Sequence, residues 1–381
     1  MAKATVVHLI TKLELGGAQR NTLLTVERLP RYGFSCQIWY GPGGLLTPRA
    51  QKLARNRQIN QLQRSLRPWK DRAALRQLVE LLRQLNPDIL HTHSSKAGFL
   101  GRLAASRCKV PVVIHSVHGF PFSPLQPLPQ QWILMGAEKM AARWTRHYIF
   151  VSRADQQTAL RLGLCGKNHS LIRSGFELEP FYPHPQRRKE VRRRFQLGDK
   201  ALAIGVVAPF KPQKNLLQVV EVAKMVCAHE PGAVFFLAGD GALRSRLESA
   251  VGRAGLQSSF RMPGFLHDLS TVMDAFDLGL STALWEGLPQ SLVQMRLKQL
   301  PVVASRIPGN SEVIRHGENG FLAAPKDTAE YVRHILQLSG NPGLRKRLGQ
   351  VPEDFSAWDA EHMVQSQAHL YDQLLSNNTR S

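Results

Sequence analysis

The sequence predicts an α/β protein of two Rossmann-like, doubly wound domains. Three observations support this fold class. Short apolar runs alternate with helix-like segments along the whole chain, which is typical of a parallel sheet covered by helices. The alternation occurs in two series, separated by a stretch rich in proline and charge. A length of 381 residues exceeds one ordinary hydrophobic core and fits two domains.

Each series contains six strand-like apolar runs. Those of the first series are Thr5–Ile10, Ser35–Tyr40, Ile89–His91, Val110–His115, Tyr148–Val151 and Ser170–Ile172. Those of the second series are Leu202–Val207, Val234–Ala238, Phe260–Met262, Leu278–Ser281, Val302–Ala304 and Gly320–Ala323. Helical patterns lie between the runs, for example at Gly17–Leu29 and Asp71–Leu85. We therefore expect two parallel sheets, one after the other along the chain.

The runs also predict the domain boundaries. The first domain covers residues 1–175, and residues 176–200 form a linker that leads into the second domain, 201–354. The final segment, 355–381, follows the completed second series, so we expect a helix that packs back towards the first domain. Doubly wound sheets hold ligands at the carboxyl ends of their strands. The two domains are therefore expected to face one another across a cleft that holds the chemistry.

The positive charge is concentrated in the first half of the chain. The net charge is +22. Residues 1–175 hold 26 Lys and Arg against 7 Asp and Glu, which gives +19, whereas residues 176–381 give +3. Much of the excess lies between Arg49 and Arg83. Such a half is attracted to an anionic surface (a membrane leaflet, a lipid phosphate or a nucleic acid), and a solvated basic face is the alternative.

Composition excludes several classes of protein. A hydrophobic content of 43% argues against intrinsic disorder. No apolar run reaches the ~18 residues that a membrane-spanning helix needs, and the N-terminus resembles a first strand rather than a signal peptide. The four cysteines, Cys36, Cys108, Cys165 and Cys227, are far apart, so we expect free thiols in a reducing cytoplasm.

The stretch 284–303, LWEGLPQSLVQMRLKQLPVV, carries the strongest functional signal. It reads as a strand end, a turn at Glu286-Gly287-Leu288, a helix and another strand. A carboxylate in this surface turn can accept hydrogen bonds from sugar hydroxyls. The unpaired N–H groups at the start of the helix can hold a phosphate. One site with both abilities indicates a nucleotide-sugar pocket.

This stretch resembles the Glu-x7-Glu signature of family 4 glycosyltransferases, with Gln294 at the second Glu position. The resemblance covers nearly the whole chain in matching order. It implies retaining transfer from a nucleoside diphosphate sugar, with Glu286 orienting the sugar and no metal ion. The second Glu of the family receives ribose hydroxyls, and Gln294 can donate and accept such bonds without a charge. Arg296, Leu297 and Lys298 stand where the family prefers small residues.

Further motifs of the first domain match the family's acceptor side. Gly16 and Gly17 open a helix after the first strand, and the resemblance places them beside the donor diphosphate. His93, Ser94 and Lys96 belong to the run 91–98, which the resemblance makes an acceptor-side loop. We expect His91 and His93 to point to opposite faces of a strand and therefore to make a poor metal pair.

His118 ends a strand in the step His-Gly-Phe, and the resemblance assigns it to the transferred sugar near the reacting carbon. A purely structural histidine is the alternative. The proline-rich loop Pro121–Pro129 and the apolar helix Gln131–Met140 follow it. They are suited to a lipid or a glycan acceptor, or they form a rigid surface loop.

Two lysines and two glycine turns belong to the donor side of the second domain. Lys214 matches a family lysine that neutralises the departing diphosphate. The family's arginine five residues earlier is replaced by Pro209, and we expect Lys211 to supply the missing charge. Gly264 and Phe265 follow a short strand, in a loop that meets the base through backbone groups in relatives, and Gly239-Asp240-Gly241 forms a similar turn.

The sequence therefore predicts a cytoplasmic enzyme of polysaccharide and cell-envelope biosynthesis, peripheral on the inner face of the membrane. It would move a sugar to a glycan or lipid-linked glycan without a metal cofactor. A nucleotide-sugar epimerase on the same fold is the enzymatic alternative. A binding protein with a degenerate site is the non-enzymatic one, suggested by Pro209 and Gln294. Nucleic-acid binding would explain the charge, but the chain shows no helix-turn-helix, zinc spacing or stacking motif, so we expect no nucleic acid.

Overall fold

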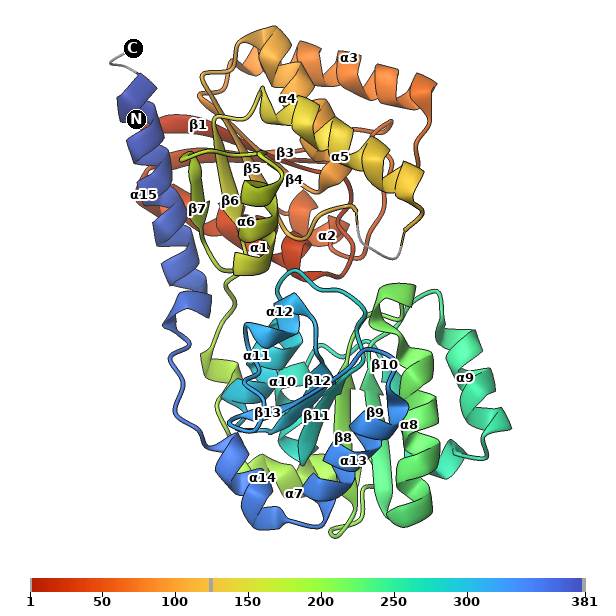
Figure 1. Cartoon of the computed structure of the whole chain (residues 1–381). Helices are drawn as coiled ribbons and strands as arrows, with labels where there is room; N and C mark the ends of the chain where they lie inside the picture. The colour runs from red at the N-terminus through yellow and green to blue at the C-terminus, as the bar shows by residue number, and fades with distance from the viewer. Residues whose placement is uncertain (1, 123–125, 379–381) are drawn as a thin grey trace. The chain divides into compact units, whose positions relative to one another are not determined.

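The computed structural model describes residues 2–122 and 126–378, so residues 123–125 of the predicted proline-rich loop lie outside the described residues. The chain forms two compact units. Unit 1 contains Met1–Phe176 and Ser356–Ser381, and unit 2 contains Glu177–Phe355. In each unit a parallel sheet lies between layers of helices (Figure 1), which confirms the predicted α/β class with two doubly wound domains.

Unit 1 is built on a seven-stranded parallel sheet in the order β3-β2-β1-β4-β5-β6-β7. Its strands are β1 (Ala4–Ile10), β2 (Phe34–Tyr40), β3 (Asn56–Gln58), β4 (Ile89–His93), β5 (Val112–Val117), β6 (His147–Phe150) and β7 (His169–Leu171). The chain first adds strands on one side of β1 and then continues on the other side with β4. The order therefore reverses between β1 and β4, and such a reversal is where doubly wound sheets hold ligands.

The strands of unit 1 differ from the predicted ones in two respects. β3 was not predicted, because it contains no apolar residue and joins the sheet edge through its backbone, with Asn56 opposite Ile38. β4 and β5 each extend two residues beyond the predicted ends, so that His93 pairs with Ser116 inside the sheet. Polar residues expected in loops are therefore held in the strand ladder itself.

Helices cover both faces of this sheet. They are α1 (Gly17–Arg28), α2 (Thr47–Gln51), α3 (Pro68–Leu85), α4 (Ser95–Cys108), α5 (Leu128–Ala142), α6 (Arg153–Arg161) and α15 (Ala360–Asn378), with the short 3-10 helices η1 (Leu29–Tyr32) and η6 (Ser356–Trp358). β1 shows why both faces need cover. Val7 and Leu9 pack into the core on one face, and Val6 and Ile10 pack into the core on the other.

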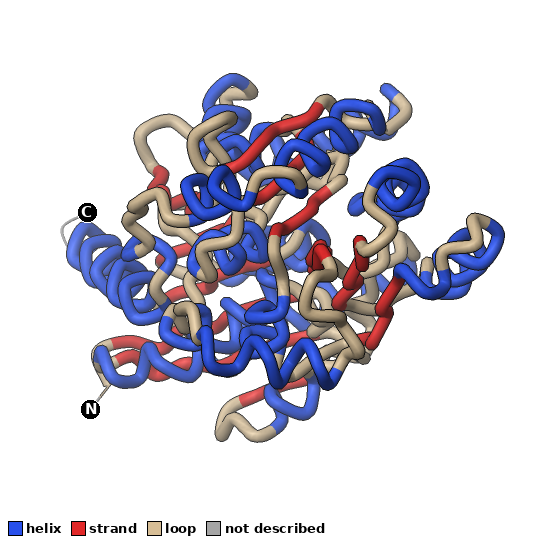
Figure 2. Tube along the Cα trace, turned by 90° about the horizontal axis from the view of Figure 1, so that it is seen from below, coloured by secondary structure: helices blue, strands red, loops and turns tan. Residues whose placement is uncertain are grey.

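The last helix, α15, is part of unit 1. Its Tyr371 is fully buried in the core, and the hydroxyl lies 2.6 Å from Nδ1 of His91 in β4. Lys3, just before β1, forms an ion pair with Asp372 at 3.0 Å. The first strand and the last helix therefore lie side by side (Figures 1 and 2).

Unit 2 is built on a six-stranded parallel sheet in the order β10-β9-β8-β11-β12-β13. Its strands are β8 (Leu202–Val207), β9 (Ala233–Ala238), β10 (Phe260–Gly264), β11 (Leu278–Ser281), β12 (Val302–Ser305) and β13 (Gly320–Ala323). All six runs of the second series form strands, which confirms that part of the prediction. The order reverses between β8 and β11.

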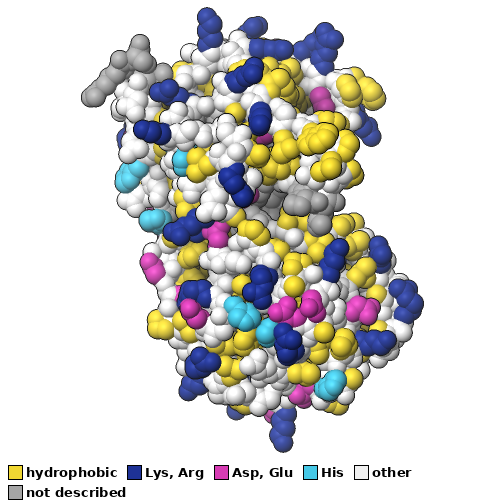
Figure 3. Space-filling view, viewed as in Figure 1, with side chains coloured by type: hydrophobic (Ala, Val, Ile, Leu, Met, Phe, Trp, Pro, Cys, Tyr) yellow, Lys and Arg dark blue, Asp and Glu magenta, His cyan; other side chains and the backbone are white. Residues whose placement is uncertain are grey.

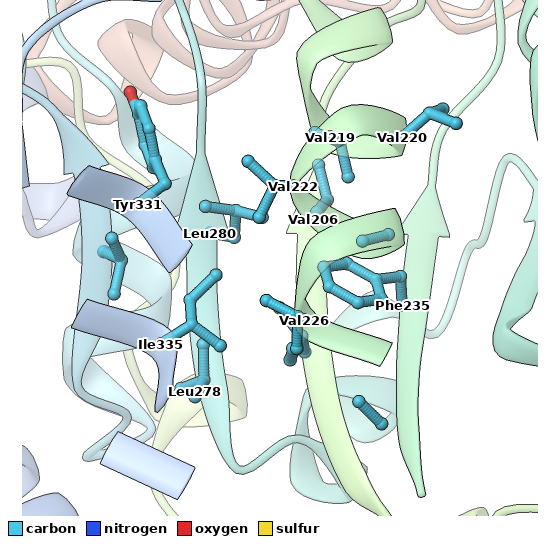
Figure 4. Packing of buried hydrophobic residues seen from close by; sticks show 14 of the residues in the cluster. Val206, Val219, Val220, Val222, Val226, Phe235, Leu278, Leu280, Tyr331 and Ile335 are labelled. Carbon is cyan, nitrogen blue, oxygen red and sulfur yellow. The ribbon is translucent and has the colours of Figure 1, made fainter. Parts of the chain in front are cut away.

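The helices of unit 2 are short and also cover both faces of the sheet. They are α7 (Pro185–Arg194), α8 (Leu216–His229), α9 (Arg244–Arg253), α10 (Leu269–Val272), α11 (Gln290–Leu297), α12 (Pro308–Ser311), α13 (Thr328–Ser339) and α14 (Pro342–Gly349), with η2 (Glu179–Phe181), η3 (Pro212–Lys214), η4 (Gln257–Ser259) and η5 (Met273–Ala275). Val219, Val222 and Val226 recur at helical spacing in α8 and face the sheet. Ile335 of α13 packs beside them over Leu278 of β11 (Figure 4).

The segment predicted to be a linker, 176–200, is almost entirely part of unit 2, because unit 2 begins at Glu177. It contains α7, and two arginines of this helix are anchored by ion pairs. Arg188 pairs with Asp277 at 2.6 Å, and Arg192, which is 3% exposed, lies 3.3 Å from the same carboxylate. The linker prediction depended on the proline and charge of this sequence, whereas Arg188 and Arg192 bind the segment to Asp277, directly before β11.

None of the helices in the described part of the chain combines the length and the apolar character that crossing a membrane requires.

Candidate active site

The predicted donor residues of unit 2 lie where its sheet order reverses. Lys214 ends η3 after β8, Lys211 immediately precedes η3, and Glu286 follows β11. The Lys214 ammonium and the Glu286 carboxylate form an ion pair in which 15% and 9% of the two side chains are exposed. The turn reaches the surface, as expected, with Trp285 exposed, but the Glu286 carboxylate folds against η3. Two residues predicted from separate motifs are in direct contact.

The loop that carries Glu286 rests on α12. A Cβ at Gly309 would lie 2.7 Å from the Glu286 carbonyl oxygen and 2.6 Å from that of Gly287, so the close approach requires glycine. Asn310 Nδ2 donates to both oxygens of Ser305 at 2.9 Å, which fixes α12 to the end of β12. We did not predict Gly309 or Asn310 from the sequence. The available signal was a Gly-Asn pair directly after a strand.

Gln294 lies in α11, the helix that follows the same loop. The residue is 8% exposed, yet none of the described residues forms a hydrogen bond with its side-chain amide. Most of the residue is buried while its amide has no partner among the described residues, so the amide is available to a ligand. Leu288 leads into Pro289 at the helix start, and no described side chain caps α11.

The large charged residues at the end of α11 have a structural explanation. Arg296 is 2% exposed and pairs with Glu353 at 2.7 Å. Lys298 is 5% exposed and pairs with Asp274 at 2.6 Å. Burial lowers the pKa of both groups, and the partnering carboxylates oppose that shift. The residues that replace the family's small ones are therefore tied into ion pairs.

The glycine turns of the donor side join the ends of β8, β9 and β10. Gly239 donates its N–H to the Gly264 carbonyl at 3.0 Å, and a Cβ at Gly239 would lie 1.9 Å from the Ala208 carbonyl oxygen. Gly264 has a φ of +83°, which favours glycine. Phe265 follows with its ring edge-on to His267 at 4.9 Å. The predicted base loop thus begins at the same sheet edge as Lys214.

The predicted motifs of unit 1 meet at its own point of reversal. Gly16 and Gly17 start α1 after β1, and the Gln19 side chain folds over Gly16, where its Oε1 would lie 2.4 Å from a Cβ. Ser94, after β4, has a φ of +64°. Its Oγ lies 2.8 Å from Thr11 Oγ1 and accepts the Thr11 N–H at 3.1 Å. Thr11, directly after β1, therefore ties the end of that strand to Ser94, and it was not predicted.

Lys96 has a different environment from the other acceptor-side residues. Its ammonium donates to Asp71 at 2.6 Å and to the Ser65 carbonyl, and 10% of the side chain is exposed. These contacts join α4 to the start of α3. The structure therefore gives Lys96 a structural role, and its charge is already paired.

The histidines of β4 point to the same face, so the expectation of opposite faces was wrong. Residues two apart on a strand share a face, and the His91 and His93 rings lie with centroids 4.2 Å apart. His91 contacts Tyr371 and Ser116 through its two nitrogens, at 2.6 and 2.7 Å. His93 Nδ1 lies 3.2 Å from His118 Nε2. Two predicted site residues, His93 and His118, are therefore directly bonded.

Burial keeps this cluster uncharged. It lowers the pKa of His118 to about 4 and that of His8, in the neighbouring strand β1, to about 3. The pKa of His93 also lies well below its ordinary value, because of burial and then of the nearby His91. His115 is lowered to about 3 by burial and then by Arg102. A neutral His118 can donate or accept a hydrogen bond, but it is not an imidazolium at neutral pH.

Two protein-family models match the chain in sequence order. The model described as Glycosyltransferase Family 4 matches residues 15–180, and the model described as Glycosyl transferases group 1 matches residues 187–352. The first lies within unit 1 apart from its last four residues, and the second lies within unit 2. Together they cover most of the chain.

Similar proteins support the same assignment. An Escherichia coli protein named UDP-Gal:alpha-D-GlcNAc-diphosphoundecaprenol alpha-1,3-galactosyltransferase is 29% identical over 342 residues, which span 89% of this chain and 88% of that protein. The putative glycosyltransferase EpsD of Bacillus subtilis (strain 168) is 27% identical over 81% of this chain and 82% of its own. The crystal structure of Anabaena Alr3699/HepE in complex with UDP shares the fold, with a TM-score of 0.79 at 19% identity over 97% of this chain and 100% of that one.

The family resemblance seen in the sequence is thus confirmed, whereas the comparisons give the epimerase alternative no support. Two family models and relatives that span most of their own length agree with the architecture of two doubly wound units. The chain therefore belongs to the glycosyltransferases, with a family 4 domain followed by a group 1 domain.

Proposed function

We propose that this chain transfers a sugar, with retention of configuration, from a nucleoside diphosphate sugar to a lipid-linked glycan. The observation that carries the proposal is the Lys214–Glu286 ion pair at the reversal point of the unit 2 sheet. It combines a hydrogen-bond acceptor for sugar hydroxyls with a cation for a diphosphate, at the edge where such sheets bind ligands.

In unit 2 the ion pair acts on the donor. Glu286 accepts hydrogen bonds from hydroxyls of the sugar. Lys214 neutralises the charge that develops on the leaving diphosphate, and its three N–H donors allow it to hold Glu286 at the same time. Gln294 offers its unpartnered amide to the ribose. Lys211, the turn at Gly264 and the start of α11 add further donors for the phosphates and the base.

In unit 1 the residues act on the sugar and the acceptor. We propose that His118 donates a hydrogen bond to the transferred sugar and that the Gly16-Gly17 turn, at the start of α1, binds the diphosphate. We propose that the acceptor attacks the face that the diphosphate leaves, through an oxocarbenium-like transition state. The E. coli relative is named for an α-linked product made from UDP-Gal, in which the sugar is also α-linked, and this agrees with retention.

The donor is found by incubating the enzyme with a panel of nucleotide sugars and an undecaprenyl-diphosphate-linked GlcNAc, the acceptor type in the name of the E. coli relative. We expect release of free nucleoside diphosphate together with a glycosylated lipid, and the HepE complex with UDP makes uridine the first nucleoside to test in the donor. Conversion of the nucleotide sugar into its epimer without acceptor would refute the proposal.

Transfer is expected to persist in excess chelator. The proposed charge stabilisation uses Lys214, Lys211 and helix N-termini, so the leaving diphosphate needs no cation. Turnover is compared with and without EDTA, before and after addition of Mg²⁺ or Mn²⁺. Activity that disappears with chelator and returns with either metal contradicts this account.

We also propose that unit 1 docks on the cytoplasmic face of the membrane. Leu66 and Trp69 at the start of α3 are 81% and 71% exposed, next to the basic residues Arg64 and Arg67. Trp132 on α5 is 64% exposed. Hydrophobic side chains gather over α5 on this face of unit 1 (Figure 3). Exposed aromatic residues beside arginines are suited to an anionic lipid surface.

The rigidity of α5 supports this docking face. Glu138 anchors the helix through a bidentate pair with the fully buried Arg102, at 2.8 and 3.0 Å. Arg102 also donates to the Tyr148 hydroxyl at 3.0 Å. Because the inner side of α5 is fixed in this way, its exposed Trp132 and Ile133 are held outward rather than collapsed onto the sheet.

The protein is expected to bind vesicles that contain anionic lipid, to bind neutral vesicles poorly and to dissociate at high salt. Each basic residue near the surface contributes up to ~1 kcal/mol, and salt screens this attraction. Changing Arg55, Arg57, Arg64 and Arg67 to Gln should weaken cosedimentation with little effect on transfer to a soluble acceptor. The matched control changes four exposed basic residues of unit 2, Arg193, Lys224, Arg246 and Arg253. Equal binding to neutral and anionic vesicles, or equal losses in the two quadruple variants, contradicts the proposal.

A further inference from the structure

Three histidines form a continuous chain of imidazole rings in unit 1. His8 lies in β1, His93 ends β4, and His118 follows β5, so the rings cross three neighbouring strands. His8 Nδ1 lies 3.1 Å from His93 Nε2, and His93 Nδ1 lies 3.2 Å from His118 Nε2. His93 therefore uses both of its nitrogens within the chain, and His8 and His118 use one each.

The three hydrogen-bonded rings have only two possible arrangements of their protons. The pKa values of all three rings lie well below 7, because burial disfavours the charged form, so each ring is neutral at neutral pH. A neutral imidazole has one donor nitrogen and one acceptor nitrogen. Each contact joins Nδ1 of one ring to Nε2 of the next. All three protons therefore lie on Nδ1, or all three lie on Nε2.

The inner end of the chain selects between these arrangements. His8 is fully buried, and its Nε2 has no hydrogen-bond partner among the described residues. With all protons on Nε2, this atom would be a buried N–H without an acceptor, which is rare in folded proteins. With all protons on Nδ1, it is an unused lone pair, a defect that proteins tolerate more often.

We propose that His8 and His93 are positioning residues that hold His118 in its Nδ1–H tautomer. His118 Nε2 then accepts the proton of His93, and its Nδ1–H remains as a donor that no described residue takes. A donor at this place binds a hydroxyl or ring oxygen of the transferred sugar, whereas the other tautomer would present only a lone pair. This role rests on the proposed function, in which His118 contacts that sugar.

The geometry favours a hydrogen-bonded chain over a metal site. Nitrogens of His8, His91 and His93 lie within 4.8 Å of one another. However, both nitrogens of His91 already contact Tyr371 and Ser116, and the facing nitrogens of His8 and His93 bond each other. A metal ion would have to break these contacts. The three histidines would also leave its positive charge uncompensated in the core.

The tautomers are measured by two-bond ¹H–¹⁵N NMR correlation on the full-length protein with ¹⁵N-labelled histidine at pH 7.5, without substrate. We expect His8, His93 and His118 all in the Nδ1–H form, although free histidine prefers Nε2–H. Any of the three in the Nε2–H or the imidazolium form overturns the proposal. So does one equivalent of tightly bound zinc that shifts these signals. The spectrum of the unmodified protein decides the matter even where a variant fails to fold.

Two substitutions at His93 separate its two nitrogens. His93→Asn keeps an amide near the position of Nδ1 and can still donate to His118, whereas His93→Gln keeps an amide near Nε2 and cannot. We expect H93N to retain kcat within a few-fold and H93Q to lose it by roughly 10-fold or more, with a smaller change in donor KM. Equal kcat in both variants overturns the proposal.

The matched control is His147→Gln. His147 is a buried histidine of β6 that forms a hydrogen bond with Ser170 at 2.9 Å and does not belong to the row of three rings. The kcat of this variant and its His118 tautomer should not change.

The proposed function and the tautomer assignment can be refuted separately. If no nucleotide sugar supports transfer but the three rings are Nδ1–H, the proposed function is wrong and the tautomer assignment stands. If transfer occurs while His118 is Nε2–H, the function stands and the positioning role is wrong.

Discussion

Replacing Glu286 by Gln is expected to lower the rate of sugar transfer by roughly 100-fold or more while unit 2 stays folded. Glutamine has nearly the same shape, but it cannot accept hydrogen bonds with a charged group, and it leaves the Lys214 ammonium without its counter-charge. Both effects act on the proposed donor site. Because 9% of the Glu286 side chain and 15% of the Lys214 side chain are exposed, we also expect a modest loss of stability. Initial transfer rates and melting temperatures measure the two effects.

The control for this variant is Glu330→Gln at the start of α13. Glu330 also belongs to unit 2 and accepts hydrogen bonds from the Ala324 N–H and from Arg306, at 2.6 and 3.5 Å. Its loss removes an ion pair without touching the proposed site, so its effect on turnover should be small. A folded Glu286→Gln protein with near-normal turnover would contradict the proposed role of Glu286 in binding the sugar of the donor. Equal losses in the two variants would indicate that general destabilisation is responsible.

Unit 1 is expected to unfold as the pH falls from 7 towards 5, whereas unit 2 stays folded. Six histidines of unit 1 have pKa values lowered mainly by burial: His8, His91, His93, His115, His118 and His147. In the unfolded chain they take up protons near pH 6.5, and in the folded unit they do so only at much lower pH. The unfolded state therefore binds more protons below pH 6.5, and stability falls as the pH falls.

The size of this effect is large for a single unit. At pH 5, each ring whose pKa in the folded unit is 4 or lower reduces the free energy of unfolding by about 2 kcal/mol. Three such rings together reduce the free energy of unfolding by about 6 kcal/mol. This is comparable with the whole stability of many domains. Among the histidines in the described part of unit 2, only His334 has a lowered pKa, so unit 2 serves as an internal control for histidine protonation.

Hydrogen exchange followed by mass spectrometry at pH 7.5 and pH 5 measures the two units within one molecule, after correction for the intrinsic pH dependence of exchange. Peptides from β1, β4 and β5 should lose protection at pH 5, and peptides from β8 and β11 should keep it. Equal protection of all five strands at pH 5 would contradict the buried, neutral histidine cluster.

The sequence predicted the sheets because their strands are buried on both faces and therefore read as apolar runs. Leu202–Val207 and Leu278–Ser281 were found with the bounds that the structure gives. β3 was missed because its three residues, Asn56–Gln58, are polar and pair only through the backbone. Apolar patterning cannot show a strand whose stability comes from the neighbour it joins.

Charged residues were the main source of error, because a sequence does not show where a charge finds its partner. Arg188 and Arg192 belong to the stretch predicted to be a linker, but Asp277, far along the chain, pairs with both. Lys96 was predicted to belong to an acceptor-side loop, but Asp71 pairs with its charge. Such partners are set by the tertiary fold, so local composition could not reveal them.

The site motifs were predictable one by one, but their connections were not. Lys214 and Glu286 come from different loops, and only the adjacency of β8 and β11 brings them together. The link from His118 through His93 to His8 depends in the same way on the order of β1, β4 and β5. A histidine within the apolar run of the first strand was the one signal in the sequence for His8.

The most direct test of the central claim is the structure of the product. The enzyme is incubated with its preferred nucleotide sugar and an undecaprenyl-diphosphate-linked GlcNAc, and the new linkage is examined by NMR. The account predicts a lipid-linked disaccharide whose new glycosidic bond has the same anomeric configuration as the sugar in the donor. A product with the opposite configuration would contradict retention. Lack of any glycan product with every donor of the panel would contradict the proposed transfer itself.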